Sequence, residues 1–167
     1  MSSFYSVDEL NTLGLKSFGE NVLISRKCSI YSPEKISIGN NVRIDDFCIL
    51  SGNISLGSHI HISAYSALYG TKGIIMEDYT GISPRSTIFS AMDDFSGEYL
   101  IGPIHPYEFT NVQGGPVVLR KFSQLGAGTI VFPSVEICEG AVTGAMTLVN
   151  KSLSSWTVNV GIPAYKL

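Results

Sequence analysis

The side chains best suited to moving a proton are His59, His61 and His105 and the adjacent carboxylates Asp93 and Asp94. An unperturbed imidazole titrates close to neutral pH, which suits a general base. A carboxylate becomes a comparable base where burial raises its pKa. These residue types therefore favour chemistry in which a proton is removed from an attacking group.

The elements that must position these side chains follow a period of six residues. The period is clearest in the stretch 125–149, whose sixth positions are Leu125, Val131, Ile137, Thr143 and Val149. It fits neither an α-helix nor a simple alternating strand. It is typical of a parallel β-helix, in which each hexapeptide forms one side of a coil. We therefore predict an all-β fold.

The same period predicts one domain, residues 1–167, with six triangular coils over residues 18–154. A second inward row contains Cys28 and Cys48, which we interpret as small core residues. Residues 6–14 predict a short helix that covers one end of the prism. Residues 156–167 predict a last extended segment.

Three insertions interrupt the period, and each follows the third hexapeptide of a coil. They should therefore leave the prism at one vertical edge. The longest, residues 89–116, predicts an irregular protruding arm with a functional role. Its aromatic side chains predict that it packs on a neighbouring subunit.

One column of turns changes character along the prism. The upper turns, residues 126–128 and 144–146, carry almost no side chains, so a ligand could lie against their backbone. The lower turns carry Tyr65 and Arg85, which suit a substrate pocket, because the arginine fork can hold a pyrophosphate or a carboxylate. Tight-turn geometry and a surface ion pair would explain the same residues without a ligand.

The residues 115–153, GPVVLRKFSQLGAGTIVFPSVEICEGAVTGAMTLVNKSL, and the VGIPA at 160–164 resemble the hexapeptide-repeat acyltransferases, the group of galactoside, maltose and serine acetyltransferases. The resemblance covers about residues 15–167. Three further segments are similar to acetyltransferases from surface-polysaccharide gene clusters: 38–52, 61–70 and 90–100.

The resemblance implies a left-handed coil, a homotrimer with active sites between subunits, and acetyl-CoA as donor; we expect no metal. It implies acetyl transfer in a ternary complex to a nucleotide-linked amino sugar, GDP-perosamine being one candidate, for O-antigen or capsule synthesis. O-acetylation of a sugar hydroxyl is the alternative. The positions that match the family's coenzyme A site are Gly126, Ala127, Gly144 and Ala145, with Lys151 and Pro163 at the nucleotide end.

The family places a catalytic histidine at the root of the arm, where this chain has Asp93 and no histidine. We rank Asp93 and Asp94 first as the base, with a pKa raised by burial between subunits. His61 ranks second, and His105, inside the arm, ranks last. A neutral amine needs less help from a base than a hydroxyl does, so the missing histidine favours an amino-sugar acceptor.

Other function classes fit less well. A metal-dependent hydratase on the same fold needs three converging histidines, but His59 falls in a turn and His61 on an outward strand position. An ice-binding β-helix would require a regular ladder of Thr on one outer face, which this sequence lacks, and a scaffold β-helix would have little use for the arm. The net charge of −3, from 11 basic and 14 acidic residues without a basic run, predicts no nucleic-acid or membrane partner. The three unpaired cysteines and the lack of a signal sequence predict a cytoplasmic protein.

Overall fold

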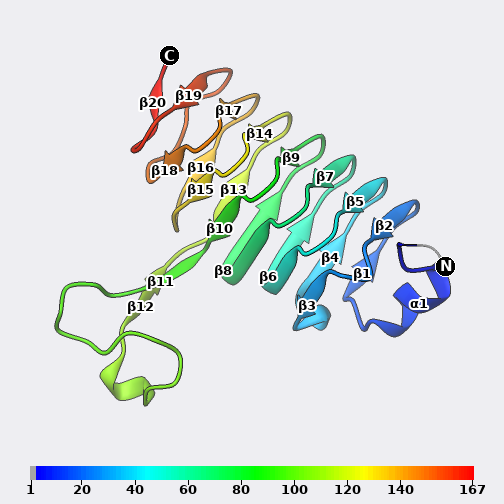
Figure 1. Ribbon diagram of the computed structural model, residues 1–167, viewed down its shortest axis with the longest axis horizontal. Coiled ribbons are helices and arrows are strands. Elements are labelled where there is room, and N and C mark those ends of the chain that lie inside the picture. Colours follow the sequence, from blue (N-terminus) through cyan, green and yellow to red (C-terminus); the bar gives the residue numbers. More distant parts are fainter. Residues whose placement is uncertain (1–2) are drawn as a thin grey trace.

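The computed structural model describes residues 3–167. The chain winds into a prism of stacked triangular coils, a left-handed parallel β-helix, with helix α1 and the C-terminus at opposite ends (Figure 1). Many corners turn through a residue at positive φ, such as Phe47 (φ 60°) and Tyr65 (φ 62°). This conformation costs a non-glycine residue about 1–2 kcal/mol. Stacking between corners of adjacent coils offsets part of that cost, as in Phe47 and Tyr65, whose ring centroids are 5.0 Å apart.

Each coil contributes short strands to three faces of the prism. The first face consists of β1 (Ser17–Phe18), β4 (Ile36–Ile38), the second halves of β6 (Ile49–Leu56) and β8 (Ala67–Met76), β13 (Val117–Leu119) and β16 (Glu136–Ile137). The second face consists of β2 (Val22–Ile24), β5 (Val42–Ile44), β7 (Ile60–Ile62), β9 (Gly81–Ile82), β14 (Gln124–Leu125), β17 (Val142–Thr143) and β19 (Val158–Val160), with β20 (Tyr165–Lys166) antiparallel to β19. The third face consists of β3 (Ser29–Tyr31), the first halves of β6 and β8, β10 (Thr87–Phe89), β15 (Ile130–Val131) and β18 (Leu148–Val149).

The interior is filled by the predicted inward rows. In the stretch 125–149 every sixth residue is at most 7% exposed, which confirms the period of six. Burying a side chain such as Ile137 contributes roughly 1.5–3 kcal/mol. The second row places hydroxyls inside, and several of these donate to the carbonyl three residues earlier in the turn. Ser86 Oγ bonds to Ser83 O at 2.9 Å and Thr147 Oγ1 to Gly144 O at 2.9 Å.

Cys28 and Cys48 lie in this second row, in register on neighbouring coils. Both thiols are buried and free. Burial raises the pKa of Cys28 to about 12, with a smaller contribution from Cys48. A thiol with such a pKa does not ionise near neutral pH, which agrees with its interpretation as a core residue.

The N-terminal helix α1 (Val7–Thr12) begins at Ser6, and the predicted capping box is present. The Ser6 hydroxyl accepts from Glu9 N, and the Glu9 carboxylate accepts from Ser6 N. Leu10 is 1% exposed and packs on the first coil, so the helix covers that end of the core. Arg26 anchors the helix through two 2.6 Å bonds to Glu9.

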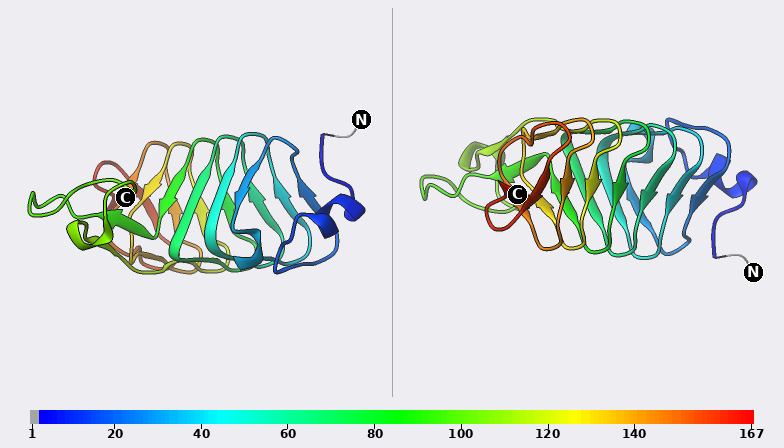
Figure 2. Two further views of the ribbon diagram at one scale, coloured as in Figure 1. Left: turned by 90° about the horizontal axis from the view of Figure 1, so that it is seen from below. Right: turned by 90° about the horizontal axis from the view of Figure 1, so that it is seen from above.

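All three insertions leave the prism at the edge between the third and first faces. The first contains the 3-10 helix η1 (Pro33–Lys35), and the second is the corner inside β8. The arm begins as an antiparallel ribbon of β11 (Ala91–Asp93) and β12 (Val112–Gly114), and its outer loop contains η2 (Tyr107–Phe109). Figures 1 and 2 show the arm projecting well beyond the prism. No helix within residues 3–167 is long and apolar enough to cross a membrane.

Candidate active site at the root of the arm

Asp93 is the last residue of β11 and faces Val112 of β12 across the ribbon. Its side chain borders two hollows, one of about 340 Å³ and one of about 330 Å³. Phe89, Ala91 and Met92 line the first hollow, which is mainly apolar. His105 lines the second, so the arm brings His105 and Asp93 to one cavity. Within residues 3–167 the Asp93 carboxylate makes no hydrogen bond or ion pair, so its oxygens are open to a group bound in either hollow.

Asp94 is the neighbour of Asp93 but has a different environment. Its carboxylate accepts hydrogen bonds from Ser96 N at 2.8 Å, Asn111 Nδ2 at 2.8 Å and Gln113 Nε2 at 3.0 Å. The bond from Ser96 N, with the bonds from the Ser96 and Asn111 side chains, lowers the pKa of Asp94 below its ordinary value. These partners come from both sides of the arm, so Asp94 holds the base of the arm together.

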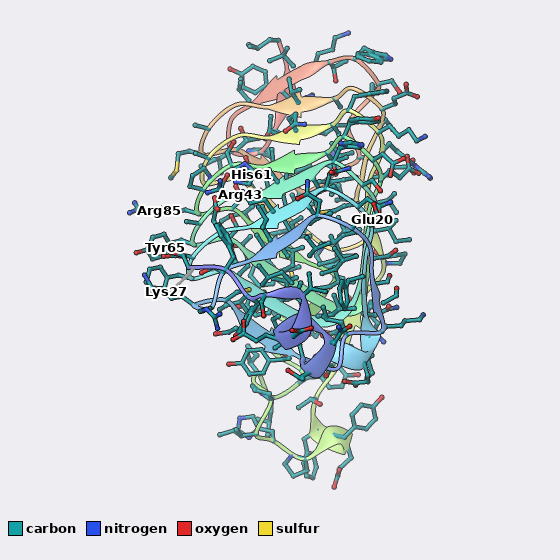
Figure 3. The ribbon with its side chains drawn as sticks, turned by 90° about the vertical axis from the view of Figure 1, so that its right-hand side faces the viewer. Glu20, Lys27, Arg43, His61, Tyr65 and Arg85 are labelled. Carbon is teal, nitrogen blue, oxygen red and sulfur yellow. The ribbon has the colours of Figure 1, made fainter. Side chains whose placement is uncertain are left out.

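His61 lies on the outer surface of β7, on the second face. Its Nε2 is 2.7 Å from Asp45 Oδ2, and Arg43 Nε is 2.7 Å from Asp45 Oδ1. Burial acts to raise the pKa of Asp45, but the bonds from Arg43 and His61 hold it below its ordinary value. Figure 3 shows Arg43 and His61 on the side of the prism away from the arm. Within one chain, His61 and Asp93 are therefore not brought together.

The upper turn column forms a third hollow, of about 650 Å³, with a strongly apolar lining. Ala127 and Ala145 line it, together with Gly128, Met146 and Ile130. Gly126 and Gly144 lie behind this surface. A Cβ on Gly126 would come within 2.5 Å of the backbone carbon of Gly144, so the close stacking of the two coils requires glycine at position 126.

Arg85 borders the lower end of this hollow, and its guanidinium lies 5.9 Å from the ring centroid of Tyr65. The stack continues downward through Phe47 to the ammonium of Lys27, 5.2 Å from the Phe47 ring. Lys27, Tyr65 and Arg85 lie along one edge of the prism (Figure 3). Arg85 thus connects the smooth upper column to a polar and aromatic lower one.

The upper hollow and the root of the arm lie on the same face. Thr87 lines the upper hollow and Phe89 lines the hollow beside Asp93. Both side chains point outward from β10, whose central Ile88 is buried. Residues two apart on a strand are about 6.6 Å from each other, so the two hollows adjoin. Our sequence reasoning missed Thr87 and Phe89; the signal was their position as outward residues of the last strand before the arm.

Lys151 and Pro163 lie at the upper end of this face. Lys151 is exposed and follows β18 by two residues. Residues 161–164 pass over β18, as Leu148 N donates to Gly161 O and Ala164 N to Leu148 O. The Ile162–Pro163 bond is cis. Neither residue lines the hollow, but both lie beyond its upper end. Among the described residues, no group of three His, Cys, Asp or Glu side chains could hold a metal ion.

No protein-family model matches the chain. A dTDP-4-amino-4,6-dideoxy-D-glucose acyltransferase of Escherichia coli is 46% identical over 159 residues, which cover 93% of this chain and 83% of the relative. A putative lipopolysaccharide biosynthesis O-acetyl transferase, WbbJ, of Escherichia coli K12 is 26% identical and covers 81% of this chain and 69% of the relative.

Among solved structures, the N-acyltransferase AntD from Bacillus cereus matches with a TM-score of 0.98 and 53% identity, over 100% of this chain and 90% of AntD. That structure, of a variant with one serine replaced by alanine, contains dTDP-4-amino-4,6-dideoxyglucose and coenzyme A. Another AntD structure contains dTDP and 3-hydroxybutyryl-CoA. The chain belongs to the left-handed β-helix family of hexapeptide-repeat, acyl-CoA-dependent sugar acyltransferases.

Proposed function

We propose that this enzyme N-acylates dTDP-4-amino-4,6-dideoxyglucose, with acetyl-CoA as donor and Asp93 as general base. The observation that carries the proposal is the adjacency of the apolar hollow at Ala127 and Ala145 to the hollow at Asp93, across Thr87 and Phe89 of β10. A donor in the first hollow would present its thioester to an acceptor in the second. We choose this dTDP sugar as the acceptor in place of GDP-perosamine for two reasons. The Escherichia coli relative is named as its acyltransferase, and an AntD structure contains it.

The upper turns suit the pantetheine arm of the donor. This arm is long and flexible and carries amide groups, which can bond to backbone N–H and C=O groups at turns without side chains. We assign contact with it to Ala127 and Ala145, and the shaping of the wall to Gly126 and Gly144. Lys151 and Pro163 would meet the nucleotide end, because they lie beyond the upper end of the hollow.

Asp93 would take the proton as the amine nitrogen attacks the thioester carbonyl carbon. A C–N bond forms and the C–S bond breaks; the departing thiolate takes the proton from Asp93, so coenzyme A leaves as its thiol and the carboxylate is restored. Support for Asp93 also comes from the AntD variants, in which one serine and one aspartate, ten positions apart, are replaced. In this sequence Ser83 and Asp93 are the one pair in which a serine precedes an aspartate by ten positions. Asp94 has three hydrogen-bond donors at its carboxylate, so we assign it to the arm.

Tyr65 and Arg85 remain our proposed contacts with substrate at the lower end of the donor hollow. We further propose a homotrimer in the cytoplasm, with each active site completed by a neighbouring subunit, serving surface-polysaccharide synthesis. The third face supports this, because outward residues such as Ile130, 40% exposed, are apolar around the site. The name of the WbbJ relative also points to lipopolysaccharide synthesis.

The test is release of free thiol from acetyl-CoA or 3-hydroxybutyryl-CoA in the presence of dTDP-4-amino-4,6-dideoxyglucose, a GDP-linked amino sugar or simple glycosides. We expect thiol release with the dTDP amino sugar and an amide in the product. A dTDP sugar with a hydroxyl in place of the amine is the control for O-acetylation, the reaction that the name of WbbJ suggests. Activity on simple glycosides alone would contradict the proposal.

A further inference from the structure

The edge that carries the three insertions also contains a recess of about 620 Å³, below the arm. Ser32 and Lys35 come from the first insertion, Ser51 and Asn53 from the corner inside β6, and Thr71 from the corner inside β8. Its remaining lining residues are Lys16, Glu34 and Gly52. The recess therefore exists because chain was inserted at this edge, and the function proposed above gives it no role.

The recess contains two of the six lysines and arginines that form no ion pair within residues 3–167. The protein has 11 lysines and arginines, and the other five form ion pairs within residues 3–167. Lys16 and Lys35 are not among these five, although Glu34 also lines the recess. Hydroxyls of Ser32, Ser51 and Thr71 add neutral donors. Ammonium groups with hydroxyls around them are suited to phosphate oxygens.

The recess is continuous with the proposed active site. Thr71 lines both the recess and the hollow that contains Asp93. Along this edge, Tyr31, Ser51, Tyr69 and Phe89 are in register on successive strands. Three strand spacings separate the first from the last, about 14 Å. A ligand that begins at Asp93 and extends away from the donor hollow would pass into the recess.

We propose that this recess binds the diphosphate of the acceptor nucleotide, with Lys16 and Lys35 as its cationic ligands. The inference rests on the proposed function, because it takes the acceptor to be a nucleoside diphosphate sugar. Donor and acceptor then approach Asp93 from opposite ends of the prism. Arg85 is another cation near the site, but it stacks on Tyr65 and borders a mainly apolar hollow. That setting suits the donor arm better than a diphosphate.

The test is calorimetric binding of dTDP and, separately, of coenzyme A to the full chain. The double variant Lys16→Ala, Lys35→Ala should bind dTDP at least tenfold more weakly and coenzyme A within twofold of wild type. Lys166→Ala is the matched control, because it removes one exposed, unpaired lysine at the other end of the prism. Its binding of both ligands should match wild type. Glu34→Gln, which removes the opposing carboxylate, should bind dTDP at least as tightly as wild type.

Three results would overturn the inference: unchanged dTDP binding in the double variant, loss of coenzyme A binding instead, or a larger loss of dTDP binding in Arg85→Ala. The second result would assign the recess to the diphosphate of the donor. If the double alanine variant melts at the wild-type temperature, its loss of dTDP binding does not come from lost folding. The same conclusion follows if the double variant Lys16→Gln, Lys35→Gln also binds dTDP more weakly. If wild type binds dTDP through these lysines but does not acylate the dTDP amino sugar, the proposed function fails and the binding site stands.

Discussion

Two regions of this prism use the same six-residue repeat in opposite ways. In the upper turns, residues 126–128 and 144–146, no chain is added and the side chains are reduced to glycine, alanine and one methionine. At the edge that carries the insertions, chain is added, and with it come Lys35, Asp93 and Asp94. The small side chains leave a smooth wall, which suits the long flexible donor that we propose there, whereas the added chain supplies charges and the carboxylate that we propose as the base. The largest effects on catalysis should therefore come from the edge, and the largest effects on donor binding and coil stacking from the wall.

Asp93→Asn should have the largest effect on turnover. The substitution keeps the size of the side chain and removes its ability to take a proton, and loss of a general base typically costs about 10²–10⁴-fold. We expect kcat to fall at least about a hundredfold, with the Kd for coenzyme A within about twofold of wild type. Single-turnover kinetics and calorimetry measure the two quantities.

The contrary result would be equally clear. If Asp93→Asn keeps near-normal turnover and His105→Ala loses it, the base lies on the other side of the same hollow, because His105 and Asp93 line it together. The division between wall and edge would survive that result, but our ranking of the residues would not.

Ala127→Leu and Gly126→Ala separate the two roles within the upper wall. Ala127 lines the hollow, so a leucine there should clash with the donor and raise the KM for acetyl-CoA about tenfold. A methyl group on Gly126 would instead meet Gly144 backbone atoms at 2.5–2.6 Å. Overpacking of this kind costs about 1–3 kcal/mol of stability.

Thermal melting and steady-state kinetics should therefore respond in opposite ways to the two variants. Ala127→Leu should melt near wild type, and Gly126→Ala should melt lower with a KM that changes less. If the KM for acetyl-CoA is the same in Ala127→Leu and wild type, the donor does not bind at this wall.

The wall was predictable from sequence and the edge only in part, for a physical reason. The stretch 125–149 repeats a local pattern, and each residue's inward or outward direction follows from its place in the hexapeptide. Insertions break that rule, so nothing in the sequence separates Asp93 from Asp94. Their difference comes from the ribbon register, which brings Asn111 and Gln113 to Asp94 across 17 and 19 residues of chain. The partnership of His61 with Asp45 was visible in principle, since β5 and β7 pair in register, but we did not consider it.

Asp94→Asn should have a moderate effect, on the arm more than on chemistry. The lowered pKa of Asp94 means that its ionised form stabilises the arm at neutral pH, and that this contribution disappears as the pH falls below its ordinary value of about 3.9. In the variant, amide hydrogen exchange in residues 95–111 should be faster at neutral pH and should lose this acid dependence. Turnover should fall about three- to tenfold, because a looser arm positions Asp93 less well. If turnover falls as far as in Asp93→Asn, the two carboxylates act together in catalysis.

His61→Ala should have the smallest effect. The imidazole bonds to Asp45 on the second face, and Arg43 still holds that carboxylate when the imidazole is removed. Exposed pairs of this kind contribute about 0–1 kcal/mol, so we expect turnover within about twofold of wild type and a nearly unchanged melting temperature. His61 can reach Asp93 only from a neighbouring chain, as in the trimer that we propose. A loss of turnover above tenfold, with normal folding, would therefore place the second face of one subunit against the arm of the next, and the site would need both.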